Sequence, residues 1–342
     1  MKYKIALVGC GRISKNHFEA IQEETRFELA GVCDIVKERA AEPGQKFNVP
    51  VYTDLKKMLQ SLQLDLLAIC TPSGLHHQHG LMAAEKKIHV LSEKPLATRL
   101  KDADSLIEAC DQSGVYLFVV KQNRLNATMQ LLKRAIDKGR FGKIYQASVN
   151  VFWQRPQDYY DQAKWRGTWE FDGGAFLNQA SHYVDGLLWL IGEAESVMGM
   201  TATMARKIES EDMGAALVHF RNGVIATINV SMLTYPKNYE GSITILGEKG
   251  TVKVGGIAVN KIEKWEFAEY DDDDKLVFES NYTPPNVYGF GHAGYYKNVA
   301  DVLDGIKEPD TDGRAGRKSL ELVLAIYKSS QTGKKIALPL TL

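Results

Sequence analysis

The sequence contains few cysteines, and their arrangement matches no metal or disulfide framework. Its 342 residues include four cysteines, all in the first third of the chain: Cys10, Cys33, Cys70 and Cys110. Their spacing fits no paired C-x-x-C zinc pattern. We therefore expect four buried free thiols, and hence a reducing compartment.

The sequence also lacks a net charge and any long apolar run. Forty-two basic and 42 acidic residues balance to zero, so the basic excess typical of nucleic-acid or membrane-surface binders is missing. No segment reaches the roughly 18 uncharged apolar residues of a membrane-spanning helix. The apolar run at residues 5–8 is too short for the core of a signal peptide. We expect a cytoplasmic protein with no nucleic-acid or membrane partner.

Short apolar runs alternate with amphipathic stretches over the first 120 residues. Buried strands separated by helices indicate a parallel sheet covered on both faces, the doubly wound α/β pattern. The predicted strands are residues 4–9, 27–33, 64–70, 89–92 and 115–120, and the predicted helices surround residues 16–21, 36–47, 55–62, 79–84 and 103–110. We assign residues 1–122 to this domain.

The pattern changes in residues 123–342, which we assign to a second, α+β domain. Alternating segments predict a large, mostly antiparallel open sheet. Asn222-Gly223 favours a two-residue hairpin turn, because both residues tolerate positive φ. The predicted strands are residues 144–153, 196–204, 214–221, 224–234, 242–246 and 251–254, and the predicted helices lie near residues 129–137, 175–191, 295–303 and 319–328. The acidic run at residues 271–274 is interpreted as a solvated turn.

A glycine-rich turn follows the first predicted strand. Gly9 permits the tight turn, Gly11 lets the backbone approach a pyrophosphate, and the small Ser14 allows close helix–strand packing. Such a motif by itself also fits a plain strand–helix turn. Asp34 ends the second strand, 23 residues after Gly11, where an acid bonds the adenosine ribose and disfavours a 2′-phosphate. The turn therefore predicts NAD rather than NADP, unless Asp34 only caps the next helix.

Two further loops follow predicted strands, at the sheet edge where ligands bind in such folds. Thr71 and Pro72 follow one strand, and Glu93-Lys94-Pro95 follows the next. Lys94 is either catalytic or an ordinary loop residue, and the proline after it favours a cis bond. His76, His77 and His79 have no matching carboxylate nearby, so we predict no metal and place His76 beside the cofactor.

Together, Gly9 to Ile13, Thr71-Pro72, Glu93-Lys94-Pro95 and Gly173-Gly174-Ala175 with His182 resemble the Gfo/Idh/MocA family. The resemblance spans essentially the whole chain. It implies a Rossmann domain followed by an open sheet, with Lys94 catalytic and His182 facing it across the nicotinamide. The implied cofactor contacts are Gly9, Gly11, Arg12, Ile13, Ser14, Asp34, Thr71, Pro72, His76, Glu93, Lys94, Gln122, Trp165 and Arg166.

One subgroup is more similar still, through Val120 to Arg124, Trp165 to Gly174 and Asn178 to His182. It comprises bacterial UDP-N-acetylglucosaminuronate 3-dehydrogenases. The resemblance implies oxidation of that sugar's C3 hydroxyl, in the biosynthesis of diacetamido uronic acids of surface polysaccharides such as lipopolysaccharide O-antigen. It also implies a dimer or tetramer, with 2-oxoglutarate as a possible route for NADH reoxidation. The alternatives are dehydrogenation of another sugar or polyol, such as inositol or glucose, and a non-catalytic NAD sensor.

The chemistry needs a proton acceptor and cations for the substrate. Asn178 and His182 are four residues apart, so on a helix both project from one face; inositol-type relatives carry Asp instead of Asn178. Either Lys94 or His182 takes the hydroxyl proton first. The expected substrate contacts are Lys94, Tyr159, Tyr160, Arg166, Asn178 and His182, with Lys121, Arg124 and Arg155 as further cations and Tyr288 and His292 as further contributors. Arg166 could instead contact the cofactor, and the tyrosines could be an ordinary aromatic cluster.

Overall fold

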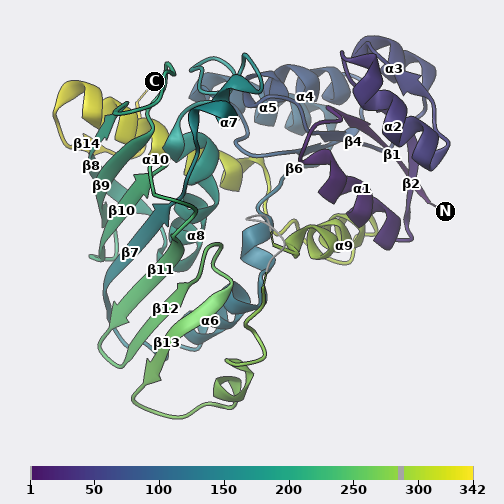
Figure 1. Cartoon of the computed structure of the whole chain (residues 1–342). Coiled ribbons are helices and arrows are strands. Elements are labelled where there is room, and N and C mark those ends of the chain that lie inside the picture. Colours follow the sequence, from purple (N-terminus) through teal and green to yellow (C-terminus); the bar gives the residue numbers. More distant parts are fainter. Residues whose placement is uncertain (1, 284–288, 342) are drawn as a thin grey trace. The chain divides into compact units, whose positions relative to one another are not determined.

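The computed structural model describes residues 2–283 and 289–341 (Figure 1). The chain divides into two compact units, Met1–Val120 with His292–Arg317 and Lys121–Gly291 with Lys318–Leu342. Residues 292–317, expected in the second domain, group with the first unit. The reason is a buried long-range contact: the Tyr295 hydroxyl donates to the Val119 carbonyl at 2.7 Å.

The first unit is built on six parallel strands in the order β3-β2-β1-β4-β5-β6. This order confirms the doubly wound prediction. The strands are β1 (Tyr3–Val8), β2 (Phe27–Cys33), β3 (Val51–Tyr52), β4 (Leu66–Ile69), β5 (His89–Ser92) and β6 (Leu117–Val119). The helices are α1 (Ser14–Glu23), α2 (Lys37–Phe47), α3 (Leu55–Ser61), α4 (His76–Ala84), α5 (Leu100–Ser113) and α9 (Gly291–Leu303), whose first residue belongs to the second unit. Only the two-residue β3 was not predicted, because it is too short to carry a pattern.

The second unit is built on an eight-stranded sheet in the order β13-β12-β11-β7-β10-β9-β8-β14. Among the described strands, β7 and β10 pair in parallel and the other neighbours pair antiparallel. The strands are β7 (Ile144–Phe152), β8 (Ala194–Ala202), β9 (Met213–Phe220), β10 (Ile225–Ser231), β11 (Glu240–Gly247), β12 (Gly250–Gly255), β13 (Lys261–Phe267) and β14 (Ile336–Ala337). The mostly antiparallel sheet and the hairpin at Gly223, whose φ is +86°, confirm the predictions. The edge strands β13 and β14 were not predicted.

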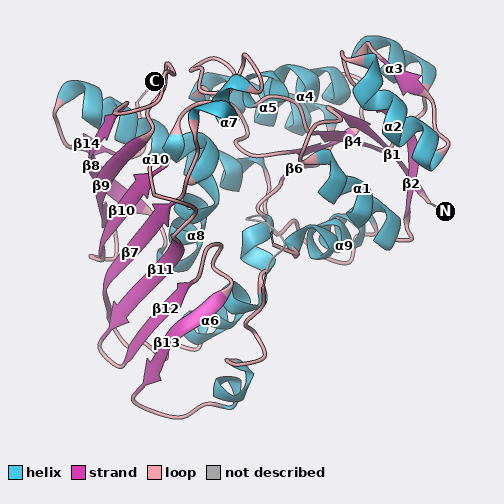
Figure 2. Ribbon diagram, viewed as in Figure 1, coloured by secondary structure: helices cyan, strands magenta, loops and turns pink. Residues whose placement is uncertain are grey.

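Helices cover one face of this sheet (Figure 2). They are α6 (Ala127–Asp137), α8 (Ser181–Ile191) and α10 (Gly313–Thr332), of which residues 318–332 belong to this unit. The short α7 (Gln157–Asp161) and a π-helical turn (Ala175–Gln179) precede α8. Side chains alternate across the sheet, so that Val218 on β9 is fully buried while its neighbour Leu217 is half exposed. Met198 on β8 lies directly opposite Leu217, and it too is exposed.

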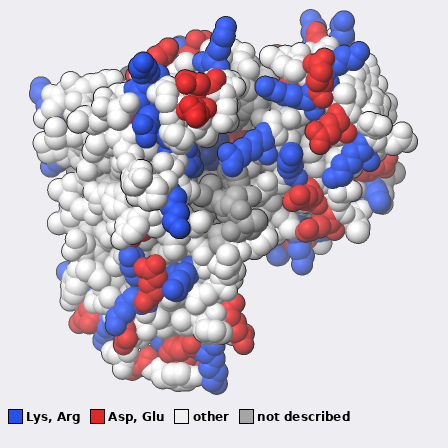
Figure 3. Space-filling view, viewed as in Figure 1, with Lys and Arg blue, Asp and Glu red and all other residues white. Residues whose placement is uncertain are grey.

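Charges of both signs are interspersed on the visible surface near β12 and β13 (Figure 3). There Lys253 bonds both Glu240 and Glu263 at 3.0 Å, and Lys264 bonds Glu266 at 3.0 Å. Within the described ranges, no helix combines the length and the apolar character needed to cross a bilayer.

Candidate active site

The turn between β1 and α1 is shaped to approach a ligand with its backbone. Gly9 has a φ of +94°, and a Cβ there would lie 2.6 Å from the Cys70 carbonyl carbon. Conformation and space therefore both require glycine. A Cβ at Gly11 would meet nothing within 4 Å, so the backbone at this position is open to a pyrophosphate. Ser14 is buried and donates to the Gly11 carbonyl at 2.6 Å, while Arg12 is exposed and Ile13 is half-buried.

Asp34 holds this turn in place. Its carboxylate accepts from the Cys10 N–H at 2.9 Å and from the Val36 N–H at 2.8 Å. The second of these bonds closes the turn before α2, whose N-cap is Val36 and has no side-chain cap, so Asp34 does not cap that helix. Each carboxylate oxygen has a further lone pair, so these bonds do not prevent a ribose contact. Asp34 is thus both a structural anchor and a candidate ribose ligand.

His76 ties together the two other predicted cofactor loops. Its Nδ1 lies 2.7 Å from the Pro95 carbonyl oxygen, and its Nε2 lies 2.8 Å from the Thr71 carbonyl oxygen. Pro72 is half-buried beside Thr71. Because both ring nitrogens of His76 are occupied by the protein, the imidazole has none left for a hydrogen bond to NAD. Its predicted role beside the cofactor is therefore one of holding the loops.

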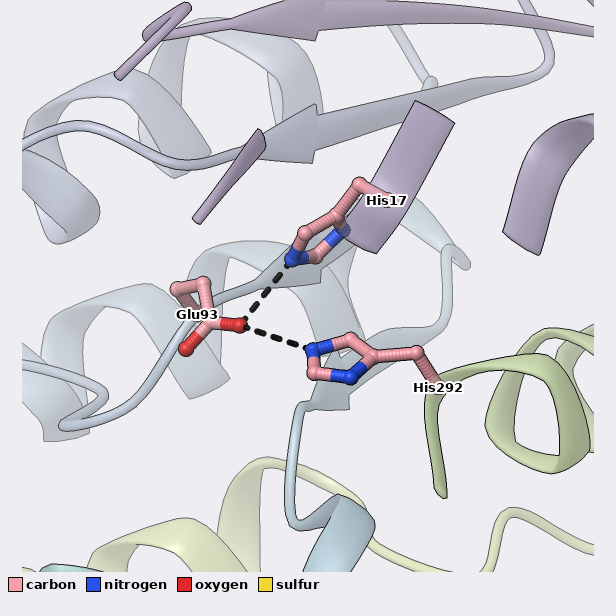
Figure 4. Close-up of side chains that lie close together, drawn as sticks. All are labelled: His17, Glu93 and His292. Carbon is pink, nitrogen blue, oxygen red and sulfur yellow. Dashed lines mark hydrogen bonds and ion pairs between the residues drawn. The ribbon is translucent and has the colours of Figure 1, made fainter. Parts of the chain in front are cut away.

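Glu93 lies in a buried cluster with two histidines (Figure 4). His17 Nε2 is 3.0 Å from Glu93 Oε1, and His292 Nε2 is 3.7 Å from the same oxygen. Burial by itself would raise the pKa of Glu93, but the hydrogen bond from His17 and the proximity of both histidines outweigh it and hold that pKa well below its usual range. Glu93 also accepts from the Lys94 N–H at 3.0 Å. The Lys94–Pro95 peptide is cis, as predicted.

The same three side chains have the composition of a metal site, since their donor atoms lie within 4.8 Å of one another. Both ring nitrogens of His17 already have hydrogen-bond partners within the protein. Burial lowers the pKa of His17. A neutral ring satisfies both of its contacts if Nε2–H donates to Glu93 and Nδ1 accepts from the Tyr296 hydroxyl at 2.8 Å. The absence of a metal stays a prediction.

In the second unit, His182 and Asn178 do not share one continuous helix. Asn178 lies in the π-helical turn, and His182 lies in the first turn of α8. The Asn178 amide donates to Asp172, while His182 Nε2 lies 3.3 Å from Gln122 Nε2. The expectation of one helical face is therefore corrected, because the chain changes its hydrogen-bonding pattern between the two residues.

Glu211 anchors the start of this π-helical turn. Its buried carboxylate accepts from the Phe176 N–H at 2.9 Å and from the Tyr327 hydroxyl at 2.8 Å. A Cβ at Gly174 would lie 1.7 Å from Glu211 Oε2, which explains why glycine precedes Ala175. Burial raises the pKa of Glu211 to about 7, against the opposing hydrogen bonds from Phe176 and Tyr327.

Arg166 is held by aromatic rings. Its guanidinium carbon lies 4.1 Å from the centre of the Tyr159 ring and 5.2 Å from that of Trp165. Its buried Nε has no hydrogen-bond partner among the described residues, so this donor is available to a ligand. Tyr160 is buried against Tyr159, edge to face, which fits the aromatic-cluster alternative for Tyr160.

The other predicted cations are already engaged. Arg124 binds Asp185 through two hydrogen bonds of 2.7 and 2.9 Å, and the buried Lys121 lies 3.9 Å from the same carboxylate. Arg155 donates to Gln179 at 2.9 Å. Lys121 and Arg124 are thus partners of Asp185, and their contact with the substrate stays a prediction.

Sequence reasoning missed four buried polar residues that shape the site, namely His17, Asp172, Asp185 and Glu211. Asp185 and His17 were detectable in principle, since each is a polar residue on the apolar face of a helix. Asp172 and Glu211 lie in loops and carry no local pattern. Tyr288 lies outside the described residues.

Comparison with known proteins agrees with this geometry. Two models of one oxidoreductase family match, the NAD-binding Rossmann fold over residues 3–121 and the C-terminal alpha/beta domain over residues 133–338. The WlbA dehydrogenase of Bordetella pertussis, solved with NADH and UDP-GlcNAcA, is 55% identical over 99% of both chains, with a TM-score of 0.97. The WlbA dehydrogenase of Chromobacterium violaceum, solved with the same ligands, is 52% identical over 100% of this chain and 97% of its own, with a TM-score of 0.95.

A curated relative, the D-apiose dehydrogenase of Paraburkholderia graminis, is 25% identical over 98% of this chain and 90% of its own. The family models together cover most of the chain, and they confirm the resemblance drawn from the motifs. The chain therefore belongs to the Gfo/Idh/MocA oxidoreductase family.

Proposed function

We propose that this protein oxidises the C3 hydroxyl of UDP-N-acetylglucosaminuronate to a ketone, with NAD as the oxidant. The observation that carries the proposal is the 55% identity, over 99% of the chain, to a dehydrogenase solved with NADH and UDP-GlcNAcA. Relatives near 25% identity act on other sugars, so family membership alone supports only a sugar dehydrogenase.

The first unit supplies the features that NAD needs. The open backbone at Gly11 and the positive end of α1 suit a pyrophosphate, and Asp34 suits the ribose hydroxyls. NAD held there would supply the acceptor for the hydride of the sugar carbon. The chain itself must then hold the cofactor, orient the sugar and remove one proton.

Lys94 and His182 are the proposed catalytic residues for that proton. A histidine near neutrality is a suitable base, and a lysine ammonium stabilises a developing alkoxide. Gln122 lies beside His182 Nε2 at 3.3 Å and so restricts the ring's orientation. Lys94 lies in a loop whose main chain is hydrogen-bonded before and after it. Its own N–H donates to the Glu93 carboxylate, and the Pro95 carbonyl contacts His76. Both residues are thus held by neighbours.

Arg166 is the proposed cation for the anionic substrate or for the cofactor. Tyr159 fixes its guanidinium plane, and its unpartnered Nε adds a directed donor. A guanidinium suits carboxylate and phosphate because it binds both oxygens at once. Asn178, held by Asp172, is the proposed neutral contact to the sugar.

The bare face of the eight-stranded sheet supports assembly with a second copy of this chain. Met198, Met200, Leu217 and Ile225 are each about half exposed or more, and they lie on adjacent strands β8, β9 and β10. Exposed apolar groups of this kind mark interaction surfaces. We expect Leu217→Lys to shift the protein toward monomer in light-scattering chromatography, whereas Lys264→Ala, outside this group, leaves the mass unchanged. A monomeric wild type would contradict the assembly.

The biological setting extends the same proposal. A cytoplasmic enzyme of this specificity would serve surface-polysaccharide synthesis, and 2-oxoglutarate could regenerate NAD. The test of function mixes purified protein and NAD with UDP-N-acetylglucosaminuronate, UDP-N-acetylglucosamine, myo-inositol or glucose and follows NADH. A parallel reaction with 2-oxoglutarate detects turnover hidden by unreleased NADH. Turnover with the nucleotide uronate alone supports the proposal, and equal turnover with inositol or glucose refutes it.

A further inference from the structure

The buried imidazole of His76 makes two contacts that a neutral ring cannot both satisfy. Nδ1 lies 2.7 Å from the Pro95 carbonyl oxygen and Nε2 lies 2.8 Å from the Thr71 carbonyl oxygen. Carbonyl oxygens only accept hydrogen bonds, whereas a neutral imidazole has one N–H and one bare nitrogen. A neutral ring would therefore set a lone pair against a lone pair at one of the two carbonyls.

We propose that His76 is a buried imidazolium that ties the Thr71 loop to the Pro95 carbonyl and thereby acts as a positioning residue for Lys94. The inference rests on the proposed catalytic role of Lys94. Hydrogen bonds hold the loop on both sides of this lysine, because Glu93 accepts from the Lys94 N–H at 3.0 Å and His76 donates to the Pro95 carbonyl. The backbone that carries the ammonium is thus fixed before and after it.

The charges around His76 make a buried cation possible. Burial opposes it most strongly, and together with the like charge of Lys94 it holds the pKa of the His76 imidazole below its usual value. The two carbonyl bonds and the Glu93 carboxylate act in the opposite direction. Glu93 is ionised, because its own bonds to the His17 and His292 cluster hold its pKa low (Figure 4). It therefore supplies a buried countercharge.

His17 provides an internal comparison in the same unit. It is as deeply buried as His76, yet its two ring nitrogens face one carboxylate and one hydroxyl. Since a hydroxyl can donate, a neutral His17 satisfies both contacts with a single ring proton. The two histidines should therefore differ in protonation although their burial is alike.

Neutron crystallography of the deuterated wild type, crystallised near pH 7.5, tests the charge directly. We expect deuterium on both Nδ1 and Nε2 of His76 and only on Nε2 of His17. A single deuteron on His76 would overturn the proposal. This measurement needs no variant and no knowledge of the sugar substrate, so it is independent of the proposed function.

Kinetics test the positioning role. Glutamine has a single donor nitrogen in place of the two ring nitrogens of His76, so we expect kcat to fall about 10- to 100-fold through misplacement of Lys94. The sugar KM should change less than threefold. His77→Gln, the same substitution on the next residue of α4, should stay within twofold of wild type. A His76→Gln enzyme with wild-type kcat, or a rise in KM alone, would contradict positioning. Wild-type turnover in Lys94→Met would instead refute the catalytic role of Lys94 and leave the neutron result standing.

Discussion

Replacing Glu211 by Gln should make the stability of this protein less dependent on pH. Burial raises the pKa of the Glu211 carboxyl from 4.5 to about 7 in the folded state. The folded protein therefore binds a proton that the unfolded chain has already lost. Stability from this group is fully present below about pH 4.5 and is lost as the pH rises to about 7.

The size of the effect follows from the shift. Each pKa unit corresponds to about 1.4 kcal/mol, so between pH 5 and pH 8 wild-type Glu211 costs the folded state about 2–3 kcal/mol. A glutamine carries no such charge, and its oxygen can still accept from the Phe176 N–H and the Tyr327 hydroxyl. Any fixed cost of the new amide is the same at both pH values and cancels from the comparison.

The assay is thermal unfolding of wild type and Glu211→Gln at pH 5 and pH 8. At about 2–4 °C per kcal/mol for a unit of this size, the Tm of the variant relative to wild type should rise by about 5–10 °C between the two pH values. Glu209→Gln, on the exposed side of the same loop, controls for the substitution. An equal Tm difference at pH 5 and pH 8 would show that Glu211 does not titrate in this range.

Three further predictions concern the cofactor and the chemistry. NAD should bind about 1–3 kcal/mol tighter than NADP because Asp34 repels a 2′-phosphate, and equal affinities in fluorescence titrations would remove Asp34 from the ribose site. Lys94→Met and His182→Asn should each keep NAD affinity within a few-fold but lower NADH formation by about 10²–10⁴; near-normal turnover in either variant would make that residue structural. Asn178→Asp places a second carboxyl against Asp172, and like charges raise the pKa of such a pair. Its kcat relative to wild type should therefore fall as the pH rises, whereas a constant ratio would show that the pair does not share a proton.

The sequence alone determined the parts of this protein that depend on local patterns. The turn at Gly9 and Gly11 and the acid at Asp34 are recognisable because glycine conformation, strand ends and helix starts follow from neighbouring residues. The alternation of apolar strands with helices similarly predicted the parallel sheet. The paired glycines before Ala175 were recognised as a motif, although their physical cause, the Glu211 carboxylate beside Gly174, was not visible.

Only the tertiary structure decided which polar groups find each other. Arg124 pairs with Asp185, and both ring nitrogens of His76 contact the carbonyl oxygens of two separate loops. Residues 292–317 belong to the first unit, where the Tyr295 hydroxyl bonds the Val119 carbonyl. Each outcome has the same physical reason. A buried polar group left unpaired costs about 1–3 kcal/mol, so it pairs with a partner that the fold brings close. That partner lies far away in the chain, and local sequence patterns therefore do not identify it.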